Sequence, residues 1–78
     1  MTEAEIISGL KEVIAKVKPG VDTTSITKDT LLVEDLAIDS LSLLMLSLAT
    51  EQKFGMQFGM QINFRTVGDV VDYIVKVL

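Results

Sequence analysis

The chain has 78 residues, of which 49% are hydrophobic and only 5% aromatic, and its formal net charge is −4. This length predicts one domain, residues 1–78, and the scarcity of aromatic residues predicts an aliphatic core. Because it has neither cysteine nor histidine, the sequence excludes disulfides and ordinary zinc sites, and its acidic balance argues against nucleic acid as a partner. No apolar run approaches the roughly 20 residues of a membrane span, and the acidic N-terminus is unlike a signal peptide, so we expect a cytoplasmic protein.

The first element is predicted to be an amphipathic helix that ends before Pro19-Gly20. Thr2 and Glu5 have the spacing of a capping box, in which each side chain bonds the backbone of the other residue. Apolar residues then recur at helical spacing, at Ile6, Ile7, Leu10, Val13, Ile14 and Val17. Proline cannot continue the helix, which places its end near Lys18.

A long loop is predicted for residues 21–39, because this stretch is rich in turn residues and shows no sustained period. It is nevertheless too apolar for a free linker, with Val21, Ile26, Leu31, Leu32, Val33, Leu36 and Ile38. We therefore expect the loop to be pinned to the core. Long loops in compact domains are usually functional.

The second helix is predicted to run from Ser40 to about Lys53, with Asp39 as its N-cap. A group attached to the Ser40 hydroxyl would lie beside unpaired N–H donors and the positive end of the helix dipole, which favour a phosphate. Apolar positions 41, 44, 45, 48 and 49 form a stripe. Leu43 and Leu46 widen the apolar surface, which leaves Ser42, Ser47, Thr50 and Glu51 as the polar residues. A helix this apolar is either central to a bundle or exposes a partner-binding face.

The remaining chain contains a four-residue tandem copy and then a final helix. Phe54–Gln57 is followed at once by Phe58–Gln61, and glycine after either phenylalanine can close the second helix. The second copy is the candidate for a short or irregular third helix. The last helix is predicted from Thr66, with Asp69 completing a capping box, to Leu78. Its apolar stripe comprises Val67, Val70, Val71, Ile74 and Leu78.

Two motifs give the chain a resemblance to the acyl carrier protein family. They are Glu34-Asp35-Leu36 with Asp39-Ser40-Leu41, and the run Thr66-Val67-Gly68-Asp69-Val70-Val71-Asp72-Tyr73-Ile74. The resemblance implies an all-α fold, a small four-helix bundle with three main helices and a short or irregular third one. It implies that Ser40 is esterified with 4′-phosphopantetheine, with Asp39 and Leu41 as flanking contacts of this cofactor. The family usually has glycine where this chain has Ala37.

In that family the protein is a carrier and not an enzyme. The resemblance implies that the carrier can shelter an apolar chain between its helices, which makes Met45 and Leu48 candidates for lining that cavity. A phosphopantetheinyl transferase would modify Ser40, and the arm would then carry acyl intermediates as thioesters between acyl ligases, ketosynthases or acyltransferases. The expected partner contacts are Glu34, Asp35, Ser42, Leu43, Met45 and Glu51. The fatty-acid type usually has several acidic residues on the second helix, whereas this chain keeps mainly Glu51, so recognition is expected to be more apolar and less salt-dependent. We expect a monomer without a bound metal.

Other functions remain open at this level. The sequence has no set of residues typical of an acid–base or nucleophilic active site, and no phosphate-binding glycine loop. An unmodified helical interaction module of the same fold is the main alternative. A peptidyl or aminoacyl carrier is less well matched, because that type usually has Gly-Gly-x-Ser-Leu where this chain has Ile38-Asp39-Ser40-Leu41. Among acyl carriers, fatty-acid, polyketide and related lipid pathways are all compatible with these residues.

Overall fold

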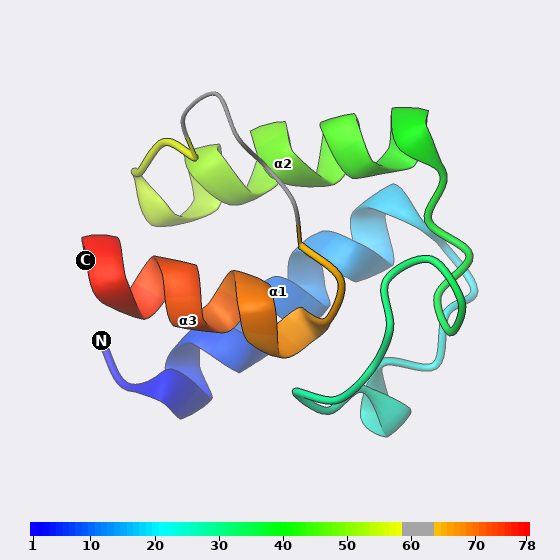
Figure 1. The fold of residues 1–78 in the computed structure, drawn as a ribbon, viewed down its shortest axis with the longest axis horizontal. Coiled ribbons are helices and arrows are strands. Elements are labelled where there is room, and N and C mark those ends of the chain that lie inside the picture. Colours follow the sequence, from blue (N-terminus) through cyan, green and yellow to red (C-terminus); the bar gives the residue numbers. More distant parts are fainter. Residues whose placement is uncertain (59–63) are drawn as a thin grey trace.

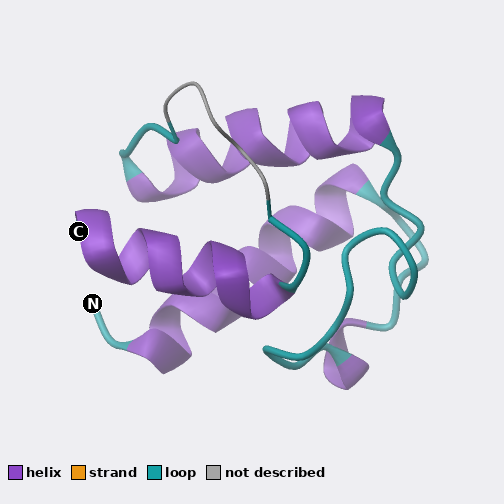
Figure 2. Ribbon diagram, viewed as in Figure 1, coloured by secondary structure: helices purple, strands orange, loops and turns teal. Residues whose placement is uncertain are grey.

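The computed structural model describes residues 1–58 and 64–78, and this part of the chain is helical (Figures 1 and 2). It contains the α-helices α1 (Glu3–Val17), α2 (Ser40–Phe54) and α3 (Val67–Val77), and one short 3-10 helix, η1 (Thr23–Ser25). The expected all-α class is confirmed. The expected bundle had a fourth, short helix, but the described residues between α2 and α3 are not helical. Residues 59–63, which include the rest of the second tandem copy, lie outside the described part.

Helix α1 begins with the predicted capping box. The Thr2 N–H donates to Oε1 of Glu5 at 2.8 Å, and the Glu5 N–H donates to Oγ1 of Thr2 at 3.2 Å. These two bonds pair N–H groups that the first helical turn would otherwise leave without a partner. The apolar stripe is also confirmed, since its central members are buried: Ile6, Leu10, Val13 and Ile14.

Helix α3 shows the same local design. The Asp69 N–H donates to Oγ1 of Thr66 at 3.0 Å, and Oδ2 of Asp69 accepts from the Thr66 N–H at 3.1 Å. Four members of its predicted stripe are buried: Val67, Val70, Val71 and Ile74. The prediction is wrong for the fifth member of the stripe, because Leu78 is 56% exposed. Val75 and Val77 in the last turn of α3 are exposed as well, whereas Ile74 in the same turn is fully buried.

Helix α1 packs against both α2 and α3, and the two termini lie at the same end of the molecule (Figure 1). Among the described residues, the buried core is aliphatic except for Phe58. Its buried apolar residues are Ile6, Leu10, Val13, Ile14, Ile26, Leu32, Leu36, Ile38, Leu46, Phe58, Val67, Val70, Val71 and Ile74. In the part of the chain that the structure describes, no helix has both the length and the apolar character to cross a bilayer.

The long loop is pinned to the core, as its composition predicts. Four of its apolar side chains are buried: Ile26, Leu32, Leu36 and Ile38. The structure adds that the loop is tied to the start of α3 by backbone hydrogen bonds. The Val67 N–H donates to the Thr30 carbonyl at 2.9 Å, and the Leu32 N–H donates to the Arg65 carbonyl at 3.0 Å. The loop therefore supplies partners for backbone groups at the N-terminal end of α3.

The end of α2 follows the Phe-Gly pattern. Gly55 adopts the left-handed conformation, with φ of 64°, and its N–H donates to the Glu51 carbonyl. Glycine accepts this conformation without the steric cost of a Cβ. The chain then turns back, and Phe58 is buried against the aromatic rings of Phe64 and Tyr73, whose ring centroids lie 5.4 Å from its own.

Candidate functional site

The candidate site is the N-terminus of α2. Asp39 has extended backbone angles, and its Oδ1 accepts a hydrogen bond of 2.8 Å from the Ser42 N–H, so it is the N-cap that the sequence predicts. This bond holds the pKa of Asp39 below its ordinary value, and the Ser42 hydroxyl and the positive charge of Lys18 lower it further. The Asp39 carboxylate is therefore ionised at neutral pH and fixed across the first turn.

Ser40 is the first residue of α2, and its side chain is exposed to solvent. Within the described part of the chain, no acceptor is found for the backbone N–H groups of Ser40 and Leu41. An oxygen-rich anion attached to the Ser40 hydroxyl could accept hydrogen bonds from such first-turn donors and would lie at the positive end of the helix dipole. The site thus fits the phosphate group of a phosphopantetheine arm.

A compact turn at residues 31–38 delivers Ser40 to the surface. The Leu32 carbonyl accepts from the Ile38 N–H at 3.1 Å, and the side chains of both residues are 1% exposed. These anchors hold the chain on either side of the turn, so α2 begins at a fixed place. Ala37 has φ of 54°, in the left-handed region where the acyl carrier family usually has glycine. A residue with a Cβ is strained in that conformation.

The acidic residues expected to contact partners differ in their surroundings. Glu34 is exposed. Asp35 is also exposed, but its Oδ2 accepts from the Leu31 N–H at 2.8 Å and so holds the turn. Glu51 is half-buried, and its Oε2 accepts from the Phe58 N–H at 2.9 Å. Among these three carboxylates, only that of Glu34 makes no hydrogen bond to a described residue.

The outward face of α2 differs from the prediction in one respect. Leu44 and Leu48 are 55% and 53% exposed, and Met45 is 48% exposed. Met45 and Leu48 therefore do not line an internal cavity, and that expectation was wrong. The sequence allowed two possibilities for this apolar helix, a central place in a bundle or an exposed apolar face. The structure shows the exposed face. Leu43 packs against the core, and Ser42 is half-buried at the first turn.

Two of the polar residues that the sequence analysis identified on α2 face the interior of the protein. Ser47 is 6% exposed and Thr50 is 1% exposed. Their hydroxyls donate to carbonyls one turn back, from Ser47 to Leu43 at 2.9 Å and from Thr50 to Leu46 at 2.6 Å. Such back-bonding satisfies a hydroxyl within its own helix, so it can be buried without an unpaired polar group.

The sequence left the buried side of α2 undecided because two stripes fit the helical period equally well. The second stripe, at 43, 46, 47, 50 and 54, has the same spacing but contains small and hydroxyl residues. A hydrophobicity count favours the leucine stripe for the core. The capacity of Ser47 and Thr50 to bond their own helix was the signal that could have identified the buried side.

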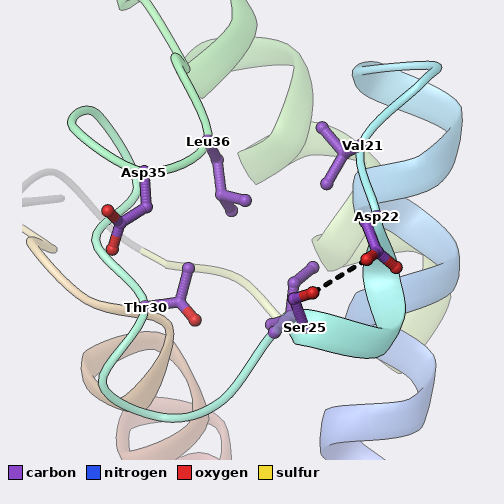
Figure 3. Close-up of a pocket in the computed structure, with 7 residues that line it drawn as sticks. Val21, Asp22, Ser25, Thr30, Asp35 and Leu36 are labelled. Atoms are coloured by element: carbon purple, nitrogen blue, oxygen red, sulfur yellow. Dashed lines mark hydrogen bonds between the residues drawn. The ribbon is translucent and has the colours of Figure 1, made fainter.

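A separate hollow of about 310 Å³ lies under the long loop (Figure 3). It is lined by Val21, Asp22, Ser25, Ile26, Thr30, Asp35 and Leu36. Oδ2 of Asp22 accepts a hydrogen bond of 2.8 Å from the Ser25 hydroxyl, and the hydroxyls of Thr24 and Ser25 lower the pKa of Asp22. The carboxylates of Asp22 and Asp35, which line this hollow, both accept hydrogen bonds from residues of the loop itself. Ser40 does not line the hollow. Among the described residues, no group of three or more acidic side chains gathers to hold a metal ion.

Comparison with known proteins agrees with this geometry. Residues 8–74 match the family described as "Phosphopantetheine attachment site". The chain is 43% identical over 77 residues to the meromycolate extension acyl carrier protein of Mycolicibacterium smegmatis, covering 96% of this chain and 77% of that protein. It is 42% identical over 78 residues to the protein of that name from Mycobacterium leprae, covering 97% and 67%. The identity to the acyl carrier protein of Rhodococcus erythropolis is 39% over 77 residues, covering 96% and 84%. The chain therefore belongs to the acyl carrier protein family, whose members carry a 4′-phosphopantetheine group.

Proposed function

We propose that this chain is an acyl carrier protein in lipid synthesis and that Ser40 is its attachment residue. The observation that carries the proposal is the position of Ser40, exposed at the first residue of α2 and directly after the N-cap Asp39. A nucleophilic hydroxyl must be accessible to be modified from outside, and the anion that results is favoured at a helix N-terminus. The fold buries the residues on either side of the turn and leaves this hydroxyl free.

The residues around Ser40 have separate roles in this proposal. Asp39 fixes the first turn through its bond to the Ser42 N–H, so that the Ser40 hydroxyl has a defined position. Leu41, which is 67% exposed, extends the surface next to the attachment point. The arm, when attached, supplies the thiol that holds an acyl group, and tethering raises the concentration of that group at a partner's active site.

Two classes of partner follow from the proposal. A phosphopantetheinyl transferase would use coenzyme A to modify Ser40, and acyl ligases, ketosynthases or acyltransferases would act on the loaded arm. The relatives named for meromycolate extension support acyl chains of lipid synthesis as the cargo. Residues 1–78 act in this proposal as one carrier domain, with Glu34, Asp35, Ser42, Leu43, Met45 and Glu51 as candidate contacts.

The test is the intact mass of the purified chain before and after incubation with coenzyme A, magnesium and a broad-specificity phosphopantetheinyl transferase. The wild type should gain one phosphopantetheine group. The Ser40→Ala variant should gain none, whereas Ser8→Ala, which changes an exposed serine on α1, should gain one group as the wild type does. A gain in the Ser40→Ala variant would assign attachment to another residue.

An unmodified interaction module is the second candidate, and the exposed apolar face of α2 is the observation that favours it. In the same experiment, a folded wild type that starts at its unmodified mass and gains nothing would support this candidate. A binding surface alone has no requirement for a serine at this helix start.

A further inference from the structure

Modification of Ser40 would add negative charge to a part of the chain that is already acidic. The phosphodiester of the arm is an anion, and Glu34, Asp35 and Asp39 lie just before Ser40 in the sequence. No lysine or arginine occurs from residue 29 to residue 52. Since like charges repel each other at close range, a cation that compensates them has to come from another element of the fold.

Helix α1 is the element that can supply this cation, because its C-terminal end lies beside the start of α2 (Figure 1). The two helices pack in antiparallel directions, and two contacts fix their register. A Cβ at Gly9 would lie 2.8 Å from the Cζ atom of Phe54, and Val13 and Ala49 line the same hollow between the helices. Each step forward along α1 is thus a step back along α2.

Lys18 is the basic residue that this arrangement brings to the site. The antiparallel register, continued to the end of α1, places Lys18 opposite about residue 44, roughly 6 Å along the helix axis from Ser40. Its side chain is half-buried. The positive charge of Lys18 also lowers the pKa of Asp39, so the ammonium group is near enough to act on groups at the start of α2.

Other basic residues of the described chain already have acidic partners. Nζ of Lys28 lies 3.3 Å from Oε1 of Glu3 and 3.2 Å from Oδ1 of Asp72. Lys53, at the far end of α2, pairs with a glutamate of α1 at 3.3 Å. Lys18 makes no ion pair with a described residue, so its ammonium group is available to a ligand.

We propose that the Lys18 ammonium binds the phosphate of the arm on Ser40 and compensates the negative charge that modification adds beside Asp39. Lysine forms charge-assisted hydrogen bonds with phosphate oxygens, and its flexible stem lets the ammonium follow the group. The first-turn N–H donors of α2 would bind the phosphate from one side and Lys18 from α1. This inference rests on the function proposed above, since it concerns the modified form of Ser40.

The experiment compares the unmodified apo form with the holo form, which carries the arm. Both forms are prepared for the wild type, Lys18→Gln, Lys18→Arg and the control Lys16→Gln, and intact mass confirms each state. Lys16 is an exposed lysine of the same helix that lines the hollow beside Ala49. Thermal unfolding gives the Tm of each form at about 20 and about 500 mM NaCl, where charge pairs are weakly and strongly screened.

We expect Lys18→Gln to lower the Tm of the holo form by about 2–5 °C more than that of the apo form, the scale of one charge pair in a domain this small. Lys18→Arg should show no such extra loss, because arginine also binds phosphate. The extra loss should shrink by half or more at the higher salt concentration. The phosphorus NMR resonance of the arm should move in Lys18→Gln and stay in place in Lys16→Gln.

A purely structural role of Lys18 predicts a different result. A positive charge at the C-terminal end of α1 stabilises the helix dipole equally in both forms. Equal losses of Tm in the apo and holo forms of Lys18→Gln would therefore overturn the inference, while the mass gain at Ser40 still upheld the proposed function. An equal extra loss in Lys16→Gln would also overturn it, because net charge alone would then explain the effect. No modification of the folded wild type would overturn both proposals.

Discussion

The backbone N–H of Gly68 donates a hydrogen bond of 2.8 Å to the carbonyl oxygen of Lys28. This bond joins the second residue of α3 to the long loop that ends at Ser40. A Cβ at Gly68 would lie 2.8 Å from the same oxygen, closer than real Cβ contacts come. Backbone atoms on both sides set this distance, so a side chain at position 68 must displace the loop.

Replacement of Gly68 by alanine should therefore lower the free energy of unfolding by about 1–3 kcal/mol, as overpacking usually does. Chemical denaturation measures the loss. The control is Lys28→Ala, which removes exposed ion pairs from Lys28 to Glu3 and Asp72 but leaves the carbonyl in place, and its effect should be much smaller. Equal losses in the two variants would mean that the Lys28 side chain, and not the close backbone approach, holds the loop.

The Ala37→Gly variant should be more stable than the wild type. Ala37 has φ of 54°, which strains a residue with a Cβ by roughly 1–2 kcal/mol, and glycine relieves this at a smaller entropic cost in the unfolded chain. We expect a gain of about 0.5–1 kcal/mol, or roughly 3–6 °C in Tm. The same substitution at Ala15, exposed within α1, should destabilise by about 0.5–1 kcal/mol. A loss at both positions would contradict a strained turn.

The stability contributed by Asp39 should depend on pH in a defined direction. Its pKa is lowered from the ordinary 3.8, chiefly by the hydrogen bond from the Ser42 N–H, so folding favours the ionised form. The contribution is complete above pH 3.8 and is lost as the pH falls through the lowered pKa. Urea unfolding of the wild type and of Asp39→Ala should be measured from neutral to acid pH. The difference between their free energies of unfolding should shrink as the pH falls through this window. A difference between the two proteins that stays constant down to acid pH would contradict an ionised N-cap at Asp39.

Removal of a core isoleucine should destabilise the protein strongly. Ile14 on α1 and Ile74 on α3 are 1% and 0% exposed, and truncation of either to alanine leaves a cavity in the core. We expect losses of about 2–5 kcal/mol for each variant, a large share of the stability of a domain this small. Val75→Ala, at a half-exposed position of α3, is the matched control and should change stability little. Unchanged unfolding midpoints for both isoleucine variants would contradict the assigned helix faces.

Most of the helices could be predicted because their signals are local. The capping boxes of Thr2 with Glu5 and of Thr66 with Asp69 form between residues three apart, and Asp39 caps α2 through a bond to the backbone of Ser42. Such bonds depend on the chain's own spacing and not on distant elements. The position of Ser40 at a helix start was readable for the same reason.

The faces of α2 were not readable from the sequence. Two stripes share the helical period, and hydrophobicity favoured the one with Leu44 and Leu48, which the structure exposes. The buried stripe contains Ser47 and Thr50, whose hydroxyls bond carbonyls of their own helix. Which stripe faces inward depends on how α2 packs against α1, and that is a property of the assembled fold.

The resemblance to the family, the extent of the main helices and the place of Ser40 at the start of α2 could thus be predicted from the residues and their spacing. The contacts of the long loop with α3 through Lys28 and Thr30, and the exposure of the apolar side of α2, emerge only in the folded molecule. Caps and helical periods act over three or four residues, whereas burial and loop contacts join residues that are far apart in the chain.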